Sequence, residues 1–314
     1  MRFLHVALAG ALAGLCFGAE PPYELSPGWP KLPADLQLGQ VTGVGVDRDN
    51  RVWVFHRHKE KPILCIDGKS GALLKSFGGE GLIENAHGLS IGPDGNLYLT
   101  DLNFHQVLVM SPQGEILQRW GEKGKPGWDA KHFNRSTMAA FDEKGTVYVG
   151  DGYGNSRVAR FSLKGEYLGE WGKKGAGPGE FQIPHGLAVD KKGLVYVADR
   201  GNSRVQIFDA SGKYLREWKS KELGRPWAIV AAPDGTFFVA DGGDEADAKG
   251  EARSKVMHVD AQGKILASWG SYGKGPGQFI WAHDMALGPD GALYVGDVKD
   301  GCRIQKFVRR KPAR

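Results

Sequence analysis

Three histidines recur at one position of a repeated unit and could together hold a metal ion. His87, His185 and His283 stand at intervals of 98 residues, and each lies eight residues before a turn glycine of its unit. Equivalent positions of a repeat fold lie in equivalent places in space, so the three imidazoles could face one point. Three neutral imidazoles with an open fourth position form a typical catalytic zinc site, which polarises a bound oxygen or lowers the pKa of a bound hydroxyl group.

A different interpretation is that each histidine belongs to the repeat consensus and binds backbone groups near the channel. That interpretation predicts a histidine in every unit, whereas Thr42, Thr137 and Trp227 occupy the matching positions of the other three units. Alternation by unit is what a three-ligand centre requires, so it favours the metal site. Other histidines lack equivalent partners and are expected to be surface or packing residues, namely His58, His105, His132 and His258.

The unit that carries the histidines is repeated six times and has the pattern of a propeller blade. Short β-branched and aromatic runs alternate with glycine-containing turns, and no segment sustains a period of 3.6 residues, so the chain is predicted to be all-β. A repeat of 42 to 56 residues with several strands fits a six-bladed β-propeller. Blades 2, 4 and 6, about 120° apart around the axis, would then carry the histidines. The turn positions are Asn50, Gly95, Gly145, Gly193, Gly235 and Gly291, and the aromatic residues expected to close blades are Phe77, Trp120, Trp171, Trp218 and Trp269.

A second group of polar residues is expected at one rim of the channel. Five units end the strand after the turn with an aspartate, whose expected role is local hydrogen bonding. The first unit has His56 there, followed by Arg57; Arg200 holds the same place in the fourth unit, and Tyr153 lies two residues after the aspartate of the third. A guanidinium can grip a carboxylate at two points, and a tyrosine near a metal can act as a base. Arg57, Tyr153 and Arg200 are therefore candidate catalytic residues, with an inter-blade salt bridge as the other interpretation of Arg200.

The N-terminal segment predicts export. Residues 1 to about 19 contain a basic residue, an apolar stretch and small residues before Glu20, which is the pattern of a cleavable signal peptide. Residues 20–314 then form one propeller domain with a short basic tail, expected to be secreted or periplasmic. No later stretch reaches 18 consecutive apolar residues, so no transmembrane helix is expected. The net charge of +5 is dispersed along the chain, which argues against nucleic-acid binding.

Two cysteines remain after the predicted signal peptide. Cys65 and Cys302 fall in corresponding strands of the first and last predicted blades, which become neighbours when the ring closes. They could form a disulfide in an oxidising compartment.

Several segments resemble, in order, the peptidyl-α-hydroxyglycine α-amidating lyase family, a branch of the NHL-repeat propellers. The resemblance covers about residues 40 to 310, and its motifs are more specific than a generic NHL repeat. The matching segments are residues 54–57 (VFHR), 87–91 (HGLSI), 151–157 (DGYGNSR), 184–188 (PHGLA), 197–200 (VADR) and 283–284 (HD). This chain departs from the family at Gly154, Tyr196 and Ile207, where the family has cysteines, and at Trp281, where it has methionine.

The resemblance implies a role for each candidate residue. In that family a catalytic zinc ion (Zn²⁺) is held by three histidines, which correspond to His87, His185 and His283. A structural calcium ion (Ca²⁺) is held by two backbone carbonyls and an aspartate, which correspond to Val44, Leu89 and Asp284. The active-site arginine and tyrosine correspond to Arg57 and Tyr153, and a further arginine near the substrate corresponds to Arg200.

The implied activity is a lyase reaction that cleaves the C–N bond of a peptidyl-α-hydroxyglycine-like carbinolamide to an amide and glyoxylate. The substrate would be a small molecule or peptide, and the protein is expected to act as a monomer without a membrane or nucleic-acid partner. Two functions from other classes remain open. A non-catalytic NHL propeller that binds a protein partner predicts no metal, and a calcium-dependent lactone hydrolase would hold its metal with Glu, Asn and Asp. Three equivalent histidines favour the lyase.

Overall fold

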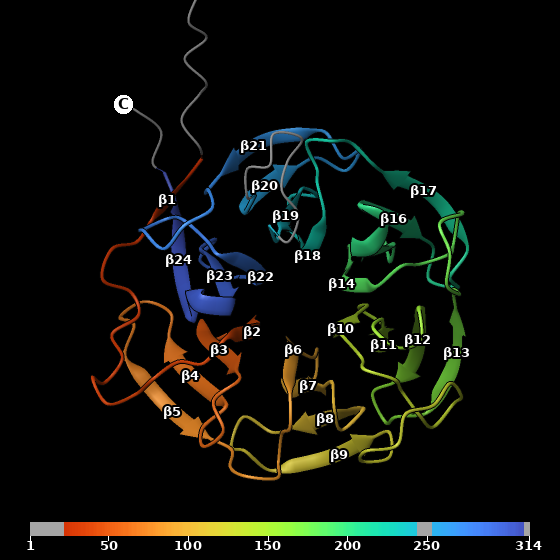
Figure 1. The fold of residues 1–314 in the computed structure, drawn as a ribbon, viewed down its shortest axis with the longest axis horizontal. Coiled ribbons are helices and arrows are strands. Elements are labelled where there is room, and N and C mark those ends of the chain that lie inside the picture. The colour runs from red at the N-terminus through yellow and green to blue at the C-terminus, as the bar shows by residue number, and fades with distance from the viewer. Residues whose placement is uncertain (1–21, 244–252, 311–314) are drawn as a thin grey trace, which may run out of the picture.

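The computed structural model describes residues 22–243 and 253–310, and these form a six-bladed β-propeller, as predicted (Figure 1). Each blade is a four-stranded antiparallel sheet, and the innermost strands surround a central channel. The predicted signal peptide lies outside the described residues. Within residues 22–243 and 253–310, no helix is long and apolar enough to cross a membrane.

The first three blades follow the chain from the innermost strand outward. Blade 1 consists of β2 (Val41–Val46), β3 (Arg51–His56), β4 (Ile63–Asp67) and β5 (Leu73–Phe77). Blade 2 consists of β6 (Ala86–Ile91), β7 (Leu97–Asp101), β8 (Gln106–Met110) and β9 (Ile116–Trp120). Blade 3 consists of β10 (Met138–Phe141), β11 (Thr146–Asp151), β12 (Arg157–Ser162) and β13 (Tyr167–Trp171).

The last three blades repeat this order, and the N-terminal strand closes the ring. Blade 4 consists of β14 (Pro184–Val189), β15 (Val195–Asp199), the short 3-10 turn η1 (Arg200–Asn202), β16 (Arg204–Phe208) and β17 (Tyr214–Trp218). Blade 5 consists of β18 (Pro226–Ala231), β19 (Phe237–Asp241), β20 (Lys255–Val259) and β21 (Ile265–Trp269). Blade 6 consists of β22 (Trp281–Leu287), β23 (Leu293–Val298), the turn η2 (Lys299–Gly301), β24 (Arg303–Arg309) and, as its outermost strand, β1 (Tyr23–Leu25).

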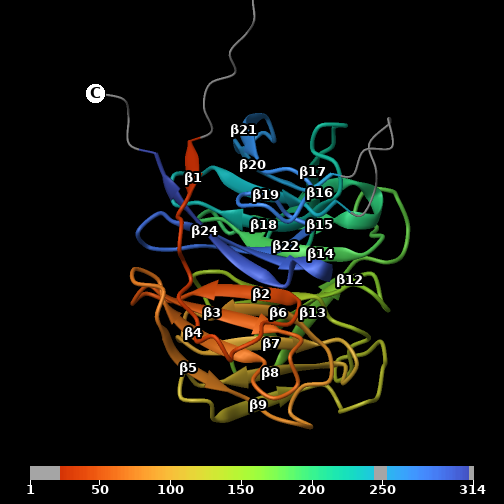
Figure 2. The ribbon, with the colours of Figure 1, turned by 60° about the vertical axis from the view of Figure 1, so that its left-hand side comes forward.

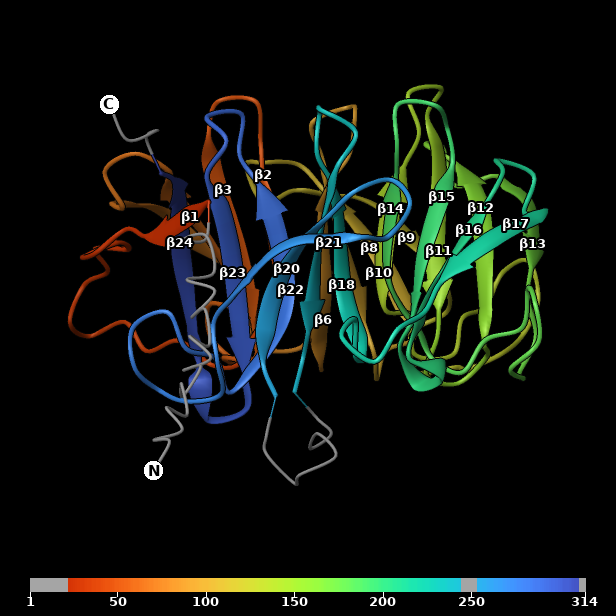
Figure 3. The same cartoon turned by 90° about the horizontal axis from the view of Figure 1, so that it is seen from above.

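The ring is held closed by pairing between the two ends of the described chain. Strand β1 pairs antiparallel with β24, with Tyr23 opposite Arg309, and Figure 2 shows β1 beside β24 at the edge of blade 6. Blade 6 and blade 1 lie next to each other, as the adjacent red-orange and blue strands show in Figures 2 and 3. The innermost strand of each blade keeps one edge towards the channel, and closure of the ring packs β2 between the inner strands β6 and β22 of its two neighbours.

The turn chemistry explains why the blades repeat so regularly. All six predicted turn positions have a left-handed backbone, for example φ 79° at Gly95 and φ 59° at Asn50. Glycine adopts this conformation without a Cβ clash, and asparagine is the side chain that tolerates it best. The tight hairpin between the two innermost strands of each blade is therefore encoded locally.

The hydrophobic core lies between blades rather than within one of them. The predicted closing residues end their strands, and each of the four tryptophans among them packs on an aromatic residue of the next blade: the rings of Trp120 and Phe161 stack with centroids 5.2 Å apart. The same inter-blade pairing recurs in Trp171–Phe208, Trp218–Phe237 and Trp269–Phe307. Aromatic pairs of this kind add about 0.5–1.5 kcal/mol each beyond burial.

The disulfide between Cys65 and Cys302 is not formed, and both thiols are free. Cys65 is buried in β4 and packs among residues of blade 2, such as Leu97 and Leu108, so it faces away from blade 6. Cys302 ends turn η2 before β24 begins, so it does not occupy the corresponding strand position. The register of blade 6 thus separates the two cysteines.

Candidate metal centre and active site

The three predicted metal ligands meet at one point of the channel. His87, His185 and His283 begin the innermost strands β6, β14 and β22, and their exposed fractions are only 1, 2 and 4%. Their ring centroids lie 4.7 to 4.9 Å apart. One nitrogen from each ring lies within 4.8 Å of the others, so the three can share one metal ion. The structure therefore confirms the convergence inferred from the 98-residue spacing.

A β-bulge aims each histidine at the channel axis. In blade 4, Pro184 pairs with Asp199 and Gly186 with Ala198, so His185 is an extra residue with no partner across the ladder. His283 is the extra residue of β22 in the same way, and the register of β6 shifts around His87. A bulge turns one side chain out of the regular alternation, which here directs the imidazole into the channel.

Each imidazole is oriented by the backbone of the following blade. Nδ1 of His87 lies 2.7 Å from the carbonyl oxygen of Thr137, and Nδ1 of His185 lies 2.7 Å from that of Trp227. Nδ1 of His283 lies 2.8 Å from the carbonyl oxygen of Thr42. A carbonyl oxygen only accepts, so each Nδ1 carries the proton and each Nε2 keeps a free lone pair. The residues that break the histidine pattern in blades 1, 3 and 5 thus supply the oxygens that fix the tautomers.

Burial keeps all three rings neutral. It lowers the pKa of His87 to about 3 and holds those of His185 and His283 well below the usual range, with their mutual repulsion as a further cause for His185 and His283. A neutral imidazole with an unprotonated Nε2 is the form that binds a metal ion. The donor set, its tautomers and its burial all fit a metal centre with three nitrogen ligands.

Tyr153 brings a hydroxyl group to the free nitrogens. Its oxygen lies 3.3 Å from Nε2 of His87 and 3.2 Å from Nε2 of His185, and it accepts a 3.0 Å hydrogen bond from Nη1 of Arg200. Burial raises the pKa of Tyr153, while Arg200 and Arg57 oppose that rise. The phenol is therefore neutral in the metal-free chain and can donate its proton to an imidazole.

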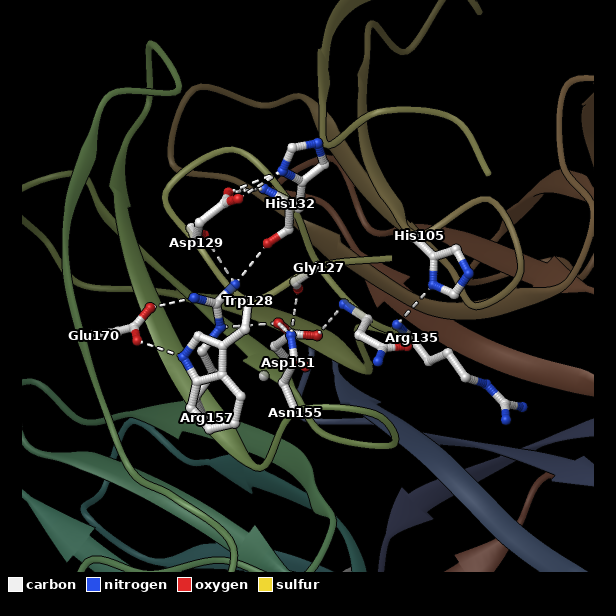
Figure 4. A network of polar contacts seen from close by, with 12 residues as sticks. His105, Gly127, Trp128, Asp129, His132, Arg135, Asp151, Asn155, Arg157 and Glu170 are labelled. Carbon is white, nitrogen blue, oxygen red and sulfur yellow. Dashed lines mark hydrogen bonds and ion pairs between the residues drawn. The ribbon is translucent and has the colours of Figure 1, made fainter. Parts of the chain in front are cut away.

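The segment that carries Tyr153 is held by a buried ion-pair network (Figure 4). The carboxylate of Asp151 accepts hydrogen bonds from the Asn134 backbone at 2.8 Å, from Asn155 at 2.6 Å and from Arg157 at 2.9 Å. Arg157 is fully buried and also pairs with Glu170. This network joins the segment that enters β10 to the loop between β11 and β12, and so it positions the tyrosine.

The aspartates at the ends of the second strands act as clamps, as their expected hydrogen-bonding role requires. In each of five blades the carboxylate accepts an N–H group from the segment that enters the innermost strand. Blade 1 does the same with Nδ1 of His56, which accepts the Gly39 N–H at 3.0 Å. The five carboxylates are those of Asp101, Asp151, Asp199, Asp241 and Asp297.

Two further arginines lie at the mouth of the site, one predicted and one not. Arg57 donates to the Ala86 carbonyl at 3.1 Å and to Oε1 of Gln40 at 2.8 Å, so it spans blades 1 and 2. Arg135 was missed: its guanidinium carbon lies 5.5 Å from the centroid of the Tyr153 ring, and Figure 4 shows its side chain leaving the Asp151 network. Arg135 stands two residues before Thr137, as Gln40 stands two residues before Thr42. This equivalence of position was the sequence signal that could have indicated Arg135 as a residue of the site.

The residues predicted to hold calcium lie on neighbouring inner strands. Val44 and Leu89 line a cavity of about 240 Å³ along the channel. The carboxylate of Asp284 is 1% exposed, and it accepts N–H groups from Val44 at 2.9 Å and from Met285 at 2.8 Å. Burial raises the pKa of Asp284 to about 7. Within the described residues no cationic side chain pairs with this carboxylate. A bound cation would compensate its buried charge.

Comparison with known sequences places this arrangement in a family. The NHL repeat model matches residues 181–208, in blade 4. The Drosophila melanogaster protein named peptidyl-alpha-hydroxyglycine alpha-amidating lyase 2 is 30% identical, over 92% of this chain and 76% of that protein. This chain belongs to the peptidyl-α-hydroxyglycine α-amidating lyase family. Family membership confirms the predicted class of enzyme, a lyase.

Other relatives are longer proteins, and similar solved structures share only the fold. Peptidyl-glycine alpha-amidating monooxygenase B of Xenopus laevis is 34% identical over 86% of this chain, which spans 34% of that relative. The chain thus covers about a third of the length of such relatives. A streptogramin B lyase structure superposes with a TM-score of 0.63 over 92% of this chain and 98% of that one, at 14% identity. At that identity the likeness shows the propeller fold alone.

Proposed function

We propose that this chain is a metal-dependent lyase that converts a peptidyl-α-hydroxyglycine-like carbinolamide into an amide and glyoxylate. In this reaction the C–N bond breaks, its electron pair goes to nitrogen, and the hydroxyl carbon becomes an aldehyde carbon. The hydroxyl group loses a proton and the departing amide nitrogen gains one, so the reaction needs no oxidant or reductant. Family membership and the site geometry both support this assignment.

The observation that carries the proposal is the convergence of three neutral imidazoles, with the Tyr153 hydroxyl group beside Nε2 of His87 and of His185. His87, His185 and His283 would hold the metal, for which we propose zinc because three nitrogen ligands and an open position suit that ion. A bound zinc ion supplies Lewis acidity that makes a nearby hydroxyl group more acidic. The calcium-dependent lactone hydrolase is disfavoured, because within the described residues the metal cluster consists of histidines only.

The remaining steps fall to side chains of the chain itself. In its phenolate form Tyr153 is placed to take the proton of the substrate hydroxyl group, and it can then return that proton to the amide nitrogen. Arg200, 3.0 Å from the phenol oxygen, stabilises the negative charge that forms there when the proton leaves. Arg57 lies beside the same centre and can bind the substrate carboxylate, which fixes the orientation of the scissile bond.

A second cation is proposed at Asp284. Calcium prefers carboxylate and backbone oxygens, and Asp284 together with the carbonyl oxygens of Val44 and Leu89 would provide them. The support is the buried carboxylate, which lacks a cationic side-chain partner among the described residues. A cation there would stabilise contacts between blades 1, 2 and 6 and so brace the channel.

The place of action is also a proposal. The predicted signal peptide indicates that the mature propeller works outside the cytoplasm. We propose separately that it works as a monomer. Its substrate would be a peptide or small molecule that ends in an α-hydroxyglycine-like group.

The direct test is to incubate zinc-loaded mature protein with α-hydroxyhippurate. Glyoxylate and benzamide should appear in equal amounts without any redox cofactor. The His87→Ala variant, checked for folding by its melting temperature, should show no activity above the uncatalysed rate. If zinc-loaded, folded protein released no glyoxylate from this substrate and from several α-hydroxyglycine peptides, the lyase assignment would be wrong.

A further inference from the structure

We infer that the substrate of this chain carries an aromatic or large apolar group directly before its α-hydroxyglycine, and that Trp227 and Trp281 form the surface which binds that group. This inference rests on the proposed lyase function and narrows it to a substrate class. We call the two indoles the indole wall.

The indole wall lies directly beside the metal centre. The Trp227 ring is 5.0 Å from the His185 ring and 5.3 Å from the His283 ring, measured between centroids. Trp281, two residues before His283, is 5.3 Å from Trp227, and the two planes are tilted by 58°. Trp227 therefore contacts two of the metal-binding imidazoles, and Trp281 extends this apolar surface from blade 5 to blade 6.

Both rings are held in place by cations. Nζ of Lys299 lies 4.3 Å from the centroid of the Trp281 ring, and the guanidinium carbon of Arg200 lies 3.7 Å from that of Trp227. Such contacts fix the orientation of an indole. Trp227 is 3% exposed, whereas Trp281 is only partly buried, so part of its surface is accessible and can bind a ligand.

The positions of the other groups leave one direction for the acyl chain. The carbon of an α-hydroxyglycine carries a hydroxyl group, a carboxylate, an acylated nitrogen and a hydrogen. The hydroxyl group must face the histidines and Tyr153, and the carboxylate is drawn to the side where Arg57 and Arg135 lie, in blades 1 and 3. The acylated nitrogen then points towards blades 5 and 6. Arg200 marks the boundary, because it contacts both the Tyr153 hydroxyl group and the Trp227 ring.

The chemistry of the wall selects what can occupy it. Indole rings bind flat aromatic groups and bulky apolar groups through dispersion and burial of apolar area. They offer little to a small acyl group, which would leave the exposed part of Trp281 in contact with water. One extra or missing methylene group at an apolar binding surface changes kcat/KM by about 10- to 200-fold. We therefore expect discrimination of that order between a benzoyl and an acetyl substrate.

The experiment compares α-hydroxyhippurate with N-acetyl-α-hydroxyglycine, which differ only in the acyl group. Wild type should cleave the benzoyl substrate with a kcat/KM about tenfold or more above that of the acetyl substrate. Trp281→Ala should remove most of this preference by lowering kcat/KM for the benzoyl substrate alone. Trp281→Phe should retain most of it, and Tyr272→Ala, which removes an exposed aromatic ring outside the site, should change neither value. Equal losses for both substrates in Trp281→Ala, or no preference in wild type, would overturn the inference.

A binding measurement separates this inference from the lyase assignment. Hippurate and N-acetylglycine lack the hydroxyl group and cannot be cleaved, so calorimetry with zinc-loaded protein reports binding alone. Hippurate should bind more tightly than N-acetylglycine in wild type, and the difference should disappear in Trp281→Ala. If neither hydroxylated substrate is cleaved but this difference is found, the indole wall is confirmed as a binding surface and the lyase assignment is wrong. If hippurate shows no advantage that depends on Trp281, the wall is wrong whether or not cleavage occurs.

Discussion

The hydroxyl oxygen of Tyr153 lies 3.0 Å from Nη1 of Arg200 and 3.2 Å from Nε2 of His185, so one phenol joins a guanidinium to a metal-binding imidazole. The guanidinium only donates, and the unprotonated Nε2 only accepts. In the metal-free chain the phenol can therefore donate to that nitrogen. Once a metal ion occupies the nitrogen this acceptor is lost, and Arg200 would stabilise the phenolate form of Tyr153 that can take a proton from the substrate. This relationship makes the proton-transfer role of Tyr153 testable apart from metal binding.

Replacing Tyr153 with phenylalanine should remove rate while keeping the site intact. A general base or acid contributes about 10²- to 10⁴-fold, so kcat should fall by that order while zinc content and hippurate affinity stay near wild type. Tyr148→Phe is the matched control, because its hydroxyl group bonds Asp142 at 3.1 Å, away from the centre. Full activity in Tyr153→Phe would remove the tyrosine from the mechanism.

The two arginines around Tyr153 should differ in their kinetic effect. Arg200→Ala removes a charge-assisted hydrogen bond to the reacting phenol, worth about 1.5–3 kcal/mol, so kcat should fall by about tenfold or more. Arg135→Ala removes an exposed cation at the mouth and should mainly raise KM. Steady-state kinetics on α-hydroxyhippurate measure both. A lower kcat in Arg135→Ala, with KM unchanged, would contradict the assignment of Arg135 to substrate capture.

Calcium should stabilise the fold through Asp284. A ligand present at about 100 times its Kd adds about 2.7 kcal/mol to the free energy of unfolding, which raises the melting temperature. The Asp284→Asn variant keeps the shape of the side chain but loses its charge, so its melting temperature should not respond to calcium. Both proteins are measured with zinc bound, so that the first site stays constant. A wild-type melting temperature that is insensitive to calcium over a wide concentration range would exclude this site.

His56 should make the fold sensitive to mild acid. Burial, with a smaller contribution from His58, lowers its pKa from 6.5 to about 4, and its neutral ring accepts the Gly39 N–H through Nδ1. A lowered histidine pKa gives stability that is present above pH 6.5 and is lost as the pH falls towards 4, by about 1–3 kcal/mol. Urea unfolding at pH 7 and pH 4.5 measures this loss.

The control for that prediction is a pair of variants. His56→Asn can still accept the Gly39 N–H and does not titrate, so it should lose less stability than wild type between the two pH values. His132→Asn removes a partly exposed histidine whose pKa is raised by Asp129, and it should not reduce the loss. Equal losses in wild type and His56→Asn would show that His56 does not control acid sensitivity.

The fold and the metal ligands could be predicted because both depend on the repeat. Left-handed turn residues such as Gly95 recur once per blade, and the histidine spacing then places three side chains around one axis. Arg57, Tyr153 and Arg200 lie at fixed offsets from the same turns, so their common rim could be predicted too. Their contacts, such as the hydrogen bond from Arg200 to Tyr153, depend on side-chain conformations that a repeat pattern does not fix.

Features that depend on side-chain direction could not be predicted. The sequence pairs Cys65 with Cys302 by position in the repeat, but Cys65 faces blade 2 in the structure. Arg135 lies in an irregular segment with φ 64°, where no strand pattern indicates the direction of its side chain. The backbone carbonyls of Thr42, Thr137 and Trp227 accept hydrogen bonds from the histidines, and the side-chain types at these positions give no clue to that role.

The central claim is that the three histidines hold the metal on which cleavage depends, and a zinc titration of metal-stripped protein tests it most directly. Glyoxylate release from α-hydroxyhippurate should rise with added zinc and level off at about one ion per chain, the stoichiometry of a single three-histidine site. His185→Ala, folded as judged by its circular dichroism, should neither retain zinc nor gain activity. Activity in the metal-stripped protein equal to that of the zinc-loaded protein, or the same titration curve in His185→Ala, would contradict the account.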